Sequence, residues 1–201
     1  MHSMRCIILA SGSPRRKELL SQLIGDSFEV VVPSYEESEI EDMDPESLVL
    51  HHAVQKGHDV AKKLQKGVVI SADSMVLCEG KLLGKPNSNL QAQQMLKLIN
   101  GQIVQVITGL VLIDVNNGKE LKDTVSTLVF IKQLSDDEIA SYVTSEEPID
   151  KAGAFAIQGK GAAIVERIEG DYFNVVGLPL FTLSEMLMQI GINVLGPTPL
   201  E

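Results

Sequence analysis

The stretch Cys6-Ile7-Ile8-Leu9-Ala10-Ser11-Gly12-Ser13-Pro14-Arg15-Arg16-Lys17-Glu18-Leu19-Leu20 decides how the chain begins to fold. Its apolar first five residues predict a buried strand. Ser13 followed by Pro14 is typical of a helix start, because serine caps free amides and proline fits the first helical position. The chain therefore opens with a strand, a tight turn and a helix.

Three cations, Arg15, Arg16 and Lys17, stand in the first turn of this helix. That turn carries free N–H groups and the positive end of the helix dipole, so each cation there costs roughly 0.3–1 kcal/mol. A bound anion would offset this cost. Free amides, the hydroxyls of Ser11 and Ser13 and two guanidinium groups together favour a phosphate site. The alternative is a solvated turn whose basic side chains point away.

The length of 201 residues suits one domain of ordinary or large size, or two small lobes that share one sheet, and we expect a single domain over residues 1–201. The net charge of −10 argues against a nucleic-acid-binding protein, which needs a basic field. No apolar run approaches the roughly 18 residues of a membrane span, and no signal peptide is evident. We therefore expect a soluble, cytoplasmic protein with no membrane partner. Cys6 and Cys78 lie in apolar runs, and we expect both thiols to be buried.

One acid, Asp73, interrupts the apolar run Gly67–Leu77 that predicts the central strand. A buried carboxylate is costly unless it is paired, hydrogen-bonded or bound to a metal. Asp73 is therefore the best single candidate for a functional residue. The alternative is that the strand ends at Ala72 and that Asp73 caps a turn. Lys85, in an extended Gly-Lys-Pro segment, stands close to Asp73 in sequence.

The remaining elements follow from local start, stop and periodicity signals. They are a strand over 28–32, an acidic loop over 36–44, a helix from Pro45, a helix after Ser88, a hairpin of strands 103–115 and 120–134, a helix after Ser135, a strand over 162–168, a turn at 170–171 and a last helix from Leu178. Between them, residues 150–161 contain three glycines, which indicates backbone close to a ligand or, alternatively, a flexible surface loop. This order of crossovers and hairpins predicts an α/β protein with a mixed sheet.

Four stretches stand out together: Ser11–Leu20, Ser71-Ala72-Asp73-Ser74-Met75-Val76, Gly84-Lys85-Pro86 and Glu147–Gly159, and Gly177-Leu178-Pro179 accompanies them. Over residues 5 to about 190 the chain resembles the Maf family of nucleoside triphosphate pyrophosphatases. The resemblance implies an elongated, twisted sheet flanked by helices, of the inosine-triphosphatase type, with two lobes around a cleft. It also implies hydrolysis of a nucleoside triphosphate to the monophosphate and pyrophosphate with Mg²⁺ or Mn²⁺.

Within the family, one branch prefers dTTP and UTP and another prefers 7-methyl-GTP. The pair Arg15-Arg16 and the run Ala152–Gly159 resemble the dTTP/UTP branch. The motif around the acid reads Ser-Ala-Asp-Ser where Gly-Ala-Asp-Thr is usual. The segment Gln55-Lys56-Gly57 stands where Glu-Lys-Ala is usual.

The resemblance also implies roles for individual residues. Asp73 matches the active-site acid, Arg15, Ser74 and Gln158 match specificity positions, and Glu37, Lys56 and Lys85 match further polar positions that line the cleft. Glu37 and Asp73 would hold the metal, and Asp73 could accept a proton from the attacking water. Arg15, Arg16, Lys56 and Lys85 would grip the triphosphate with the amides of Ser11–Ser13, while Gln158 and Ser74 would read the base edge.

Two other functions stay open from the sequence. The same reaction could act on modified or non-standard nucleotides in a house-cleaning role, because base selectivity depends on fine pocket shape. A non-catalytic nucleotide-binding regulator of cell division would keep the phosphate grip without needing the acids. Asp73 and Glu37 together favour the enzyme. A homodimer is compatible with the family resemblance.

Overall fold

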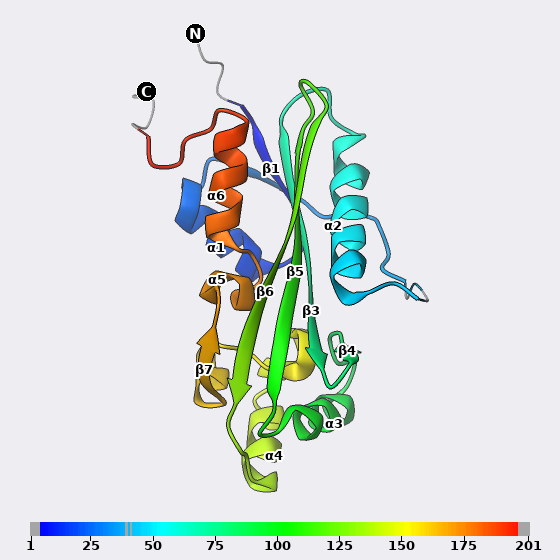
Figure 1. Ribbon diagram of the computed structural model, residues 1–201, viewed down its shortest axis with the longest axis vertical. Coiled ribbons are helices and arrows are strands. Elements are labelled where there is room, and N and C mark those ends of the chain that lie inside the picture. Colours follow the sequence, from blue (N-terminus) through cyan, green and yellow to red (C-terminus); the bar gives the residue numbers. More distant parts are fainter. Residues whose placement is uncertain (1–4, 39, 41, 197–201) are drawn as a thin grey trace.

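The protein is described here from a computed structural model that covers residues 5–38, 40 and 42–196 (Figure 1). Glu39 and Glu41 of the expected acidic loop lie outside the described residues, as do 1–4 and 197–201. In chain order the elements are β1 (Ile7–Ala10), α1 (Pro14–Ile24), β2 (Glu29–Val31), α2 (Pro45–Ala61), β3 (Val68–Cys78), β4 (Lys81–Leu83), α3 (Asn89–Ile99), β5 (Ile103–Asp114), β6 (Lys119–Ile131), α4 (Asp136–Thr144), the 3₁₀ turns η1 (Glu147–Asp150), η2 (Ala152–Ala154) and η3 (Gly159–Ala163), β7 (Val165–Glu169), α5 (Tyr172–Val176) and α6 (Leu180–Gln189).

The strands form one seven-stranded sheet in the order β2-β1-β3-β5-β6-β7, with β4 paired to β3. β1 runs parallel to β2 and to β3, and every other pairing is antiparallel. β5 and β6 form the predicted hairpin, in which Gly118 supplies a φ of 74° that glycine adopts without strain. The prediction of a mixed α/β sheet flanked by helices is confirmed.

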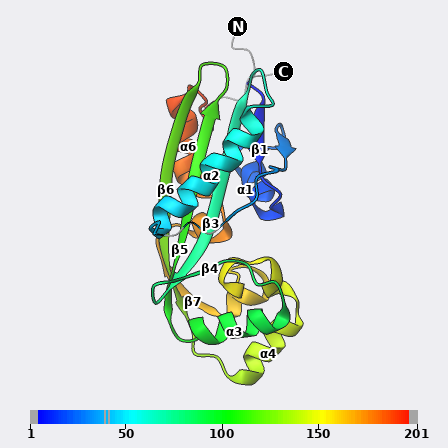
Figure 2. The same cartoon turned by 90° about the vertical axis from the view of Figure 1, so that its right-hand side faces the viewer.

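Helices cover both faces of one half of the sheet, as Figures 1 and 2 show. α2 lies on one face, where Ala53 and Val60 share an apolar cluster with Val69 of β3. α1 and α6 lie on the other face, and their leucines share a second cluster with Ile70. A third cluster unites α3, α4, η1 and η2 with the far ends of β3, β5 and β6. The three long strands β3, β5 and β6 thus run through both halves of the molecule.

Two predictions about local structure are wrong. The strand expected over 162–168 begins at Val165, because residues 159–163 form the tight turn η3. Cys6 is exposed, because it precedes β1 and its thiol faces the Glu29 carboxylate at 3.6 Å, whereas Cys78 is buried as expected.

A short helix was not predicted. Asp171 accepts a hydrogen bond from the amide of Phe173 and so caps α5, which has only five residues. α5 then packs against β5 and β6. The predicted organisation as one domain over 1–201 and the compatibility with a homodimer stay predictions.

Candidate active site

The site lies at a gap along one edge of β3. On that edge β3 pairs with β1 as far as Ser71 and with β4 only from Val76 onward. Among the residues that the structure describes, 72–75 therefore have no strand partner on this side, although they pair with β5 on the other. The gap adjoins the carboxyl end of β1 and the start of α1, the type of position where ligands bind in α/β sheets. Since alternate side chains point to opposite faces, Asp73 faces α2 and Ser74 faces the other layer.

Asp73 lies inside the strand, so the alternative that the strand ends at Ala72 is wrong. The residue is 4% exposed. Lys56 of α2 places its Nζ 2.6 Å from Asp73 Oδ1 and 2.5 Å from Glu37 Oε1, and so joins both carboxylates. Asp73 Oδ2 is buried and has no hydrogen-bond partner among the residues that the structure describes. Burial acts to raise the pKa of Glu37, but Lys56 and other cations outweigh it, so that this pKa is lowered overall.

Two glycines let α2 approach the sheet closely enough for Lys56 to reach Asp73. Gly109 of β5 pairs with Asp73, and a Cβ built on it would lie 2.6 Å from the backbone of Val49. A Cβ on Gly57 would lie 2.6 Å from the hydroxyl of Ser71. That buried hydroxyl donates to the carbonyl of Ala53 at 2.7 Å and ties β3 to α2. Side chains at either glycine would push the helix away from the strand.

The loop that carries Glu37 is anchored to the same helix. Asp59 Oδ2 accepts hydrogen bonds from the amide of Ser34 at 2.7 Å and from its hydroxyl at 3.0 Å. Lys62 and Lys63 pair with the same carboxylate. Hydrogen bonds from Lys62, the Ser34 amide and Lys63 hold the pKa of Asp59 well below its usual range. Helix α2 thus positions both Lys56 and the loop of Glu37.

Arg16 points into the protein and closes the gap from the α1 side. Its guanidinium donates to the carbonyl of Ala72 at 2.7 Å, to Ser74 Oγ at 3.0 Å and to the carbonyl of Gly177 at 2.8 Å. Ser74 Oγ in turn shares a hydrogen bond with the Thr108 hydroxyl at 2.8 Å. Burial lowers the pKa of Arg16, while the nearby Asp73 and Glu37 act in the opposite direction. Arg16 is therefore a partly buried cation that joins α1, β3 and the end of α5.

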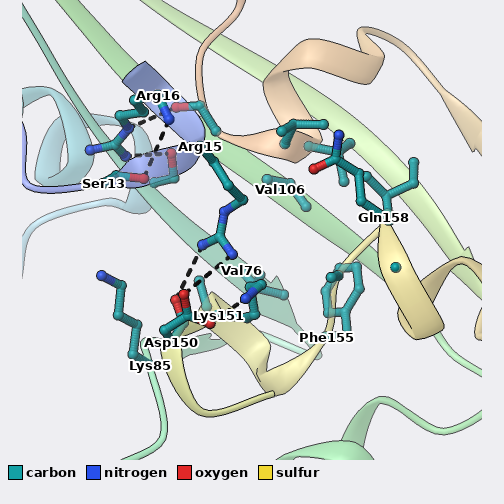
Figure 3. A pocket seen from close by; sticks show the side chains of 18 of the residues that line it. Ser13, Arg15, Arg16, Val76, Lys85, Val106, Asp150, Lys151, Phe155 and Gln158 are labelled. Atoms are coloured by element: carbon teal, nitrogen blue, oxygen red, sulfur yellow. Dashed lines mark hydrogen bonds and ion pairs between the residues drawn. The ribbon is translucent and has the colours of Figure 1, made fainter. Parts of the chain in front are cut away.

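A cavity of about 340 Å³ opens beside this gap (Figure 3). The predicted residues Ser13, Arg15, Arg16, Ser74, Lys85 and Gln158 line it. Arg15 reaches across the cavity to Asp150, whose carbonyl accepts a hydrogen bond from it at 3.2 Å and whose carboxylate lies 3.6 Å away. Partial desolvation and the nearby Arg16 lower the pKa of Lys85. In Figure 3, Gln158 lies on the far side of the cavity from Lys85, beyond the apolar side chains of Val76 and Phe155.

Ser11 and Ser13 use their hydroxyls within the turn itself. Ser11 Oγ accepts from the amide of Ser13 at 3.1 Å, and Ser13 Oγ accepts from the amide of Arg16 as the predicted N-cap. Ser11 is buried and does not line the cavity. The structure therefore groups the predicted residues into a carboxylate–lysine cluster (Glu37, Lys56 and Asp73), a cavity lining, and a supporting turn.

Comparison with known proteins identifies the family. The model of the family described as Maf-like protein matches residues 6–190 of the chain. The chain belongs to the Maf family. A Maf relative from Methanococcoides burtonii, named dTTP/UTP pyrophosphatase, is 56% identical over 191 residues, which are 95% of this chain and 98% of the relative. A relative of the same name from Methanosarcina barkeri is also 56% identical, over 95% of this chain and 97% of its own.

A solved structure shares the fold of this Maf protein. The structure of a HAM1 protein from Coxiella burnetii superposes with a TM-score of 0.52 at 18% identity, and covers 92% of this chain and 100% of that one. HAM1 proteins have the inosine-triphosphatase-like fold, so the predicted fold type is confirmed. Within the described part of the chain, no helix is long and apolar enough to cross a membrane.

Two features of the candidate site of this Maf protein were not predicted from the sequence. Gly109 stands alone inside an apolar strand, a pattern that signals close backbone approach. Glu147 also lines the cavity, and its carboxylate accepts hydrogen bonds from the amides of Lys160 and Gly161, which follow Gln158. Glu147 lies within the stretch that carries the family resemblance, but nothing in its spacing indicates which groups it contacts.

Proposed function

We propose that this Maf protein is a metal-dependent nucleoside triphosphate pyrophosphatase that hydrolyses dTTP and UTP to the nucleoside monophosphate and pyrophosphate. The relatives named dTTP/UTP pyrophosphatase, at 56% identity over nearly the whole chain, support the reaction and the substrates. The structural observation that carries the proposal is Lys56 held between Glu37 and Asp73, at a strand gap beside a cavity lined by cations.

The carboxylates fit a divalent cation. Asp73 Oδ2 is buried and unpartnered among the described residues, and Glu37 contributes a second hard oxygen donor. Across the described part of the chain, no group of three or more His, Cys, Asp or Glu side chains is arranged to hold a metal. Two carboxylates suit Mg²⁺ or Mn²⁺, which keep water and substrate phosphate oxygens as further ligands. When bound, such a cation would neutralise phosphate charge and lower the pKa of a nearby water.

Lysine and arginine side chains would bind the triphosphate. Lys56 and Lys85 would neutralise phosphate oxygens near the carboxylates, and Arg15 would exchange its contact with Asp150 for a contact with substrate. Arg16 already has three protein acceptors, so it would act mainly by keeping positive charge and geometry beneath the phosphates. The amides of the Ser11–Ser13 turn would add donors at the start of α1.

The reaction is attack of water on the α-phosphorus. The bond from that phosphorus to the α–β bridging oxygen breaks, and pyrophosphate leaves with the electron pair. Asp73 would also accept the proton from the attacking water. Most of the acceleration would come from positioning and from neutralising charge on the phosphates.

The base would occupy the apolar part of the cavity, between Val76, Val106 and Phe155. Gln158 would read the O4/N3 edge that uracil and thymine share, because an amide can both donate and accept there. Ser74 Oγ is engaged by Arg16 and Thr108, so its influence on the base would pass through Arg16.

Two negative charges argue against a protein that only binds nucleotide. Glu37 and Asp73 would repel a triphosphate, and a passive binding site gains nothing from such repulsion. With a divalent cation they would also activate a water for attack on the phosphate, which a passive binding site does not need.

The test measures pyrophosphate release from dTTP, UTP, CTP, 7-methyl-GTP and dITP with Mg²⁺ and with Mn²⁺. Preferential release from dTTP and UTP supports the proposal. Asp73→Asn should lose nearly all turnover, while Asp123→Asn, a change on the exposed side of β6, should keep it. Near-wild-type turnover in a folded Asp73→Asn variant would contradict the catalytic assignment.

A further inference from the structure

Glu147 is a carboxylate in the cavity lining whose two oxygens are both occupied by the protein. Oε1 accepts from the Tyr142 hydroxyl at 2.9 Å and from the amide of Gly161 at 2.9 Å. Oε2 accepts from the amide of Lys160 at 3.0 Å. Burial acts to raise the pKa of Glu147, but the two amides and the hydroxyl outweigh it and hold this pKa below its usual value. Glu147 is therefore an ionised anchor for backbone amides.

The segment that Glu147 anchors is built around its carboxylate. Gly159 has a φ of 62°, and a Cβ built on it would lie 2.5 Å from Glu147 Oε2. A Cβ on Gly161 would collide with the carbonyl of Ala156 and would lie 2.8 Å from the Tyr142 hydroxyl. The two glycines thus allow η3 to close tightly over Glu147 and Tyr142.

Gln158 lies inside this segment, between the fixed points. The amide of Ala156 donates to the Tyr142 hydroxyl at 3.2 Å on one side of Gln158. The amides of Lys160 and Gly161 bind Glu147 on the other side. Among the described residues, no hydrogen bond holds the exposed Gln158 side chain itself. The direction of this side chain therefore depends on its backbone, and the backbone depends on Glu147 and Tyr142.

We infer that Glu147, supported by Tyr142, is a positioning residue that orients Gln158 and thereby sets nucleobase preference. This inference rests on the proposed function, because it takes Gln158 as the reader of the base. Both Glu147 oxygens already accept hydrogen bonds from the protein, and two of the donors are backbone amides of the loop, so we expect Glu147 to act through the loop. A loosened loop would let Gln158 lose its aligned contact with uracil while leaving the phosphate grip intact.

Glu147→Gln is the central variant. A glutamine offers one acceptor oxygen, and its NH₂ group would face at least one of the three donors that now meet the carboxylate. The matched control is Glu146→Gln, the same change at the neighbouring exposed residue, whose side chain has no hydrogen bond among those of the described residues. Tyr142→Phe is a second variant, because it removes the hydroxyl that links Ala156 to Glu147.

The measurement is kcat/KM for UTP and CTP, which share the triphosphate and ribose but differ at the base edge. Glu147→Gln should lower kcat/KM for UTP by about tenfold, through KM more than kcat, and leave CTP nearly unchanged. The UTP-to-CTP ratio should therefore fall about tenfold, while Glu146→Gln keeps the wild-type ratio. Tyr142→Phe should lower the ratio in the same direction.

An unchanged ratio in folded Glu147→Gln, or equal losses for UTP and CTP, would overturn the inference. If Glu147→Gln does not fold, the ratio in Tyr142→Phe decides in the same way. Amide hydrogen exchange over residues 156–161, measured without nucleotide, should be about tenfold faster in Glu147→Gln than in Glu146→Gln. Absence of UTP hydrolysis in the wild type would instead refute the proposed function, and the exchange measurement would still test the anchoring.

Discussion

The contact between Gly57 and Ser71 predicts a strong coupling between two substitutions. A Cβ at position 57 would lie 2.6 Å from Ser71 Oγ, 3.1 Å from Ile113 Cδ1 and 3.5 Å from Ser71 Cβ. The first contact is too short for any Cβ, and Ser71→Ala removes that atom. The second contact requires only a shift of a few tenths of an ångström at the end of the Ile113 side chain. We therefore compare four proteins: the wild type, Gly57→Ala, Ser71→Ala and the double variant.

The magnitudes follow from these contacts. Gly57→Ala alone should destabilise by about 1–3 kcal/mol through overpacking, offset by a helix-propensity gain of about 1 kcal/mol. Ser71→Ala should cost about 0.5–1.5 kcal/mol, because the hydrogen bond to the Ala53 carbonyl is lost. In the double variant the collision with the hydroxyl is gone and the helix gain remains. The free energy of unfolding of the double variant should therefore be about 1–3 kcal/mol higher than the value expected from adding the two single changes.

The assay is urea unfolding of the four proteins at neutral pH, analysed by linear extrapolation. Gly57→Ala combined with Ser141→Ala, an exposed serine of α4, serves as control and should be additive. A coupling below about 0.5 kcal/mol between Gly57→Ala and Ser71→Ala would contradict the predicted collision between the new methyl group and the Ser71 hydroxyl. It would mean that the seam between α2 and β3, which brings Lys56 to Asp73, is not packed as described.

Three further predictions concern the same region. Arg16→Lys should lower the unfolding free energy by about 2–3 kcal/mol in a urea titration, because one ammonium cannot serve three separate acceptors; unchanged stability would contradict this. The lowered pKa of Asp59 implies stability that is present above its ordinary pKa of 3.8 and is lost as pH falls below it. The difference in the free energy of unfolding between the wild type and Asp59→Asn should therefore shrink from pH 6 to pH 3. A difference that stays constant over this range would contradict the prediction. Mg²⁺ should raise the thermal midpoint of the wild type but not of Asp73→Asn, and equal shifts in both would exclude Asp73 as a ligand.

Local signals in the sequence predicted several features correctly, because their physics is local. Ser13 caps α1 and Ser135 caps α4, each through the side-chain bond that its spacing predicts. The burial of Asp73 followed from one acid in an apolar run, since such a run continues as a strand regardless of the acid.

Other features depend on contacts between distant residues and could not be predicted in this way. The first-turn cations of α1 suggested two guanidinium groups facing a phosphate, but Arg16 turns inward to Ala72 and Gly177, which lie 56 and 161 residues away in sequence. η3 replaces the start of the expected strand because Glu147 binds the amides of Lys160 and Gly161. Glycine-rich sequence permits such a turn, and only the tertiary partner selects it.

The most direct test of the account is the position of bond cleavage in UTP. Hydrolysis in water labelled with heavy oxygen, with products separated and weighed by mass spectrometry, shows which phosphorus the water attacks. UMP should carry the label and pyrophosphate should carry none, because in the proposed mechanism Asp73 and Lys56 direct water to the α-phosphorus. Label in pyrophosphate, or release of orthophosphate with UDP, would contradict it.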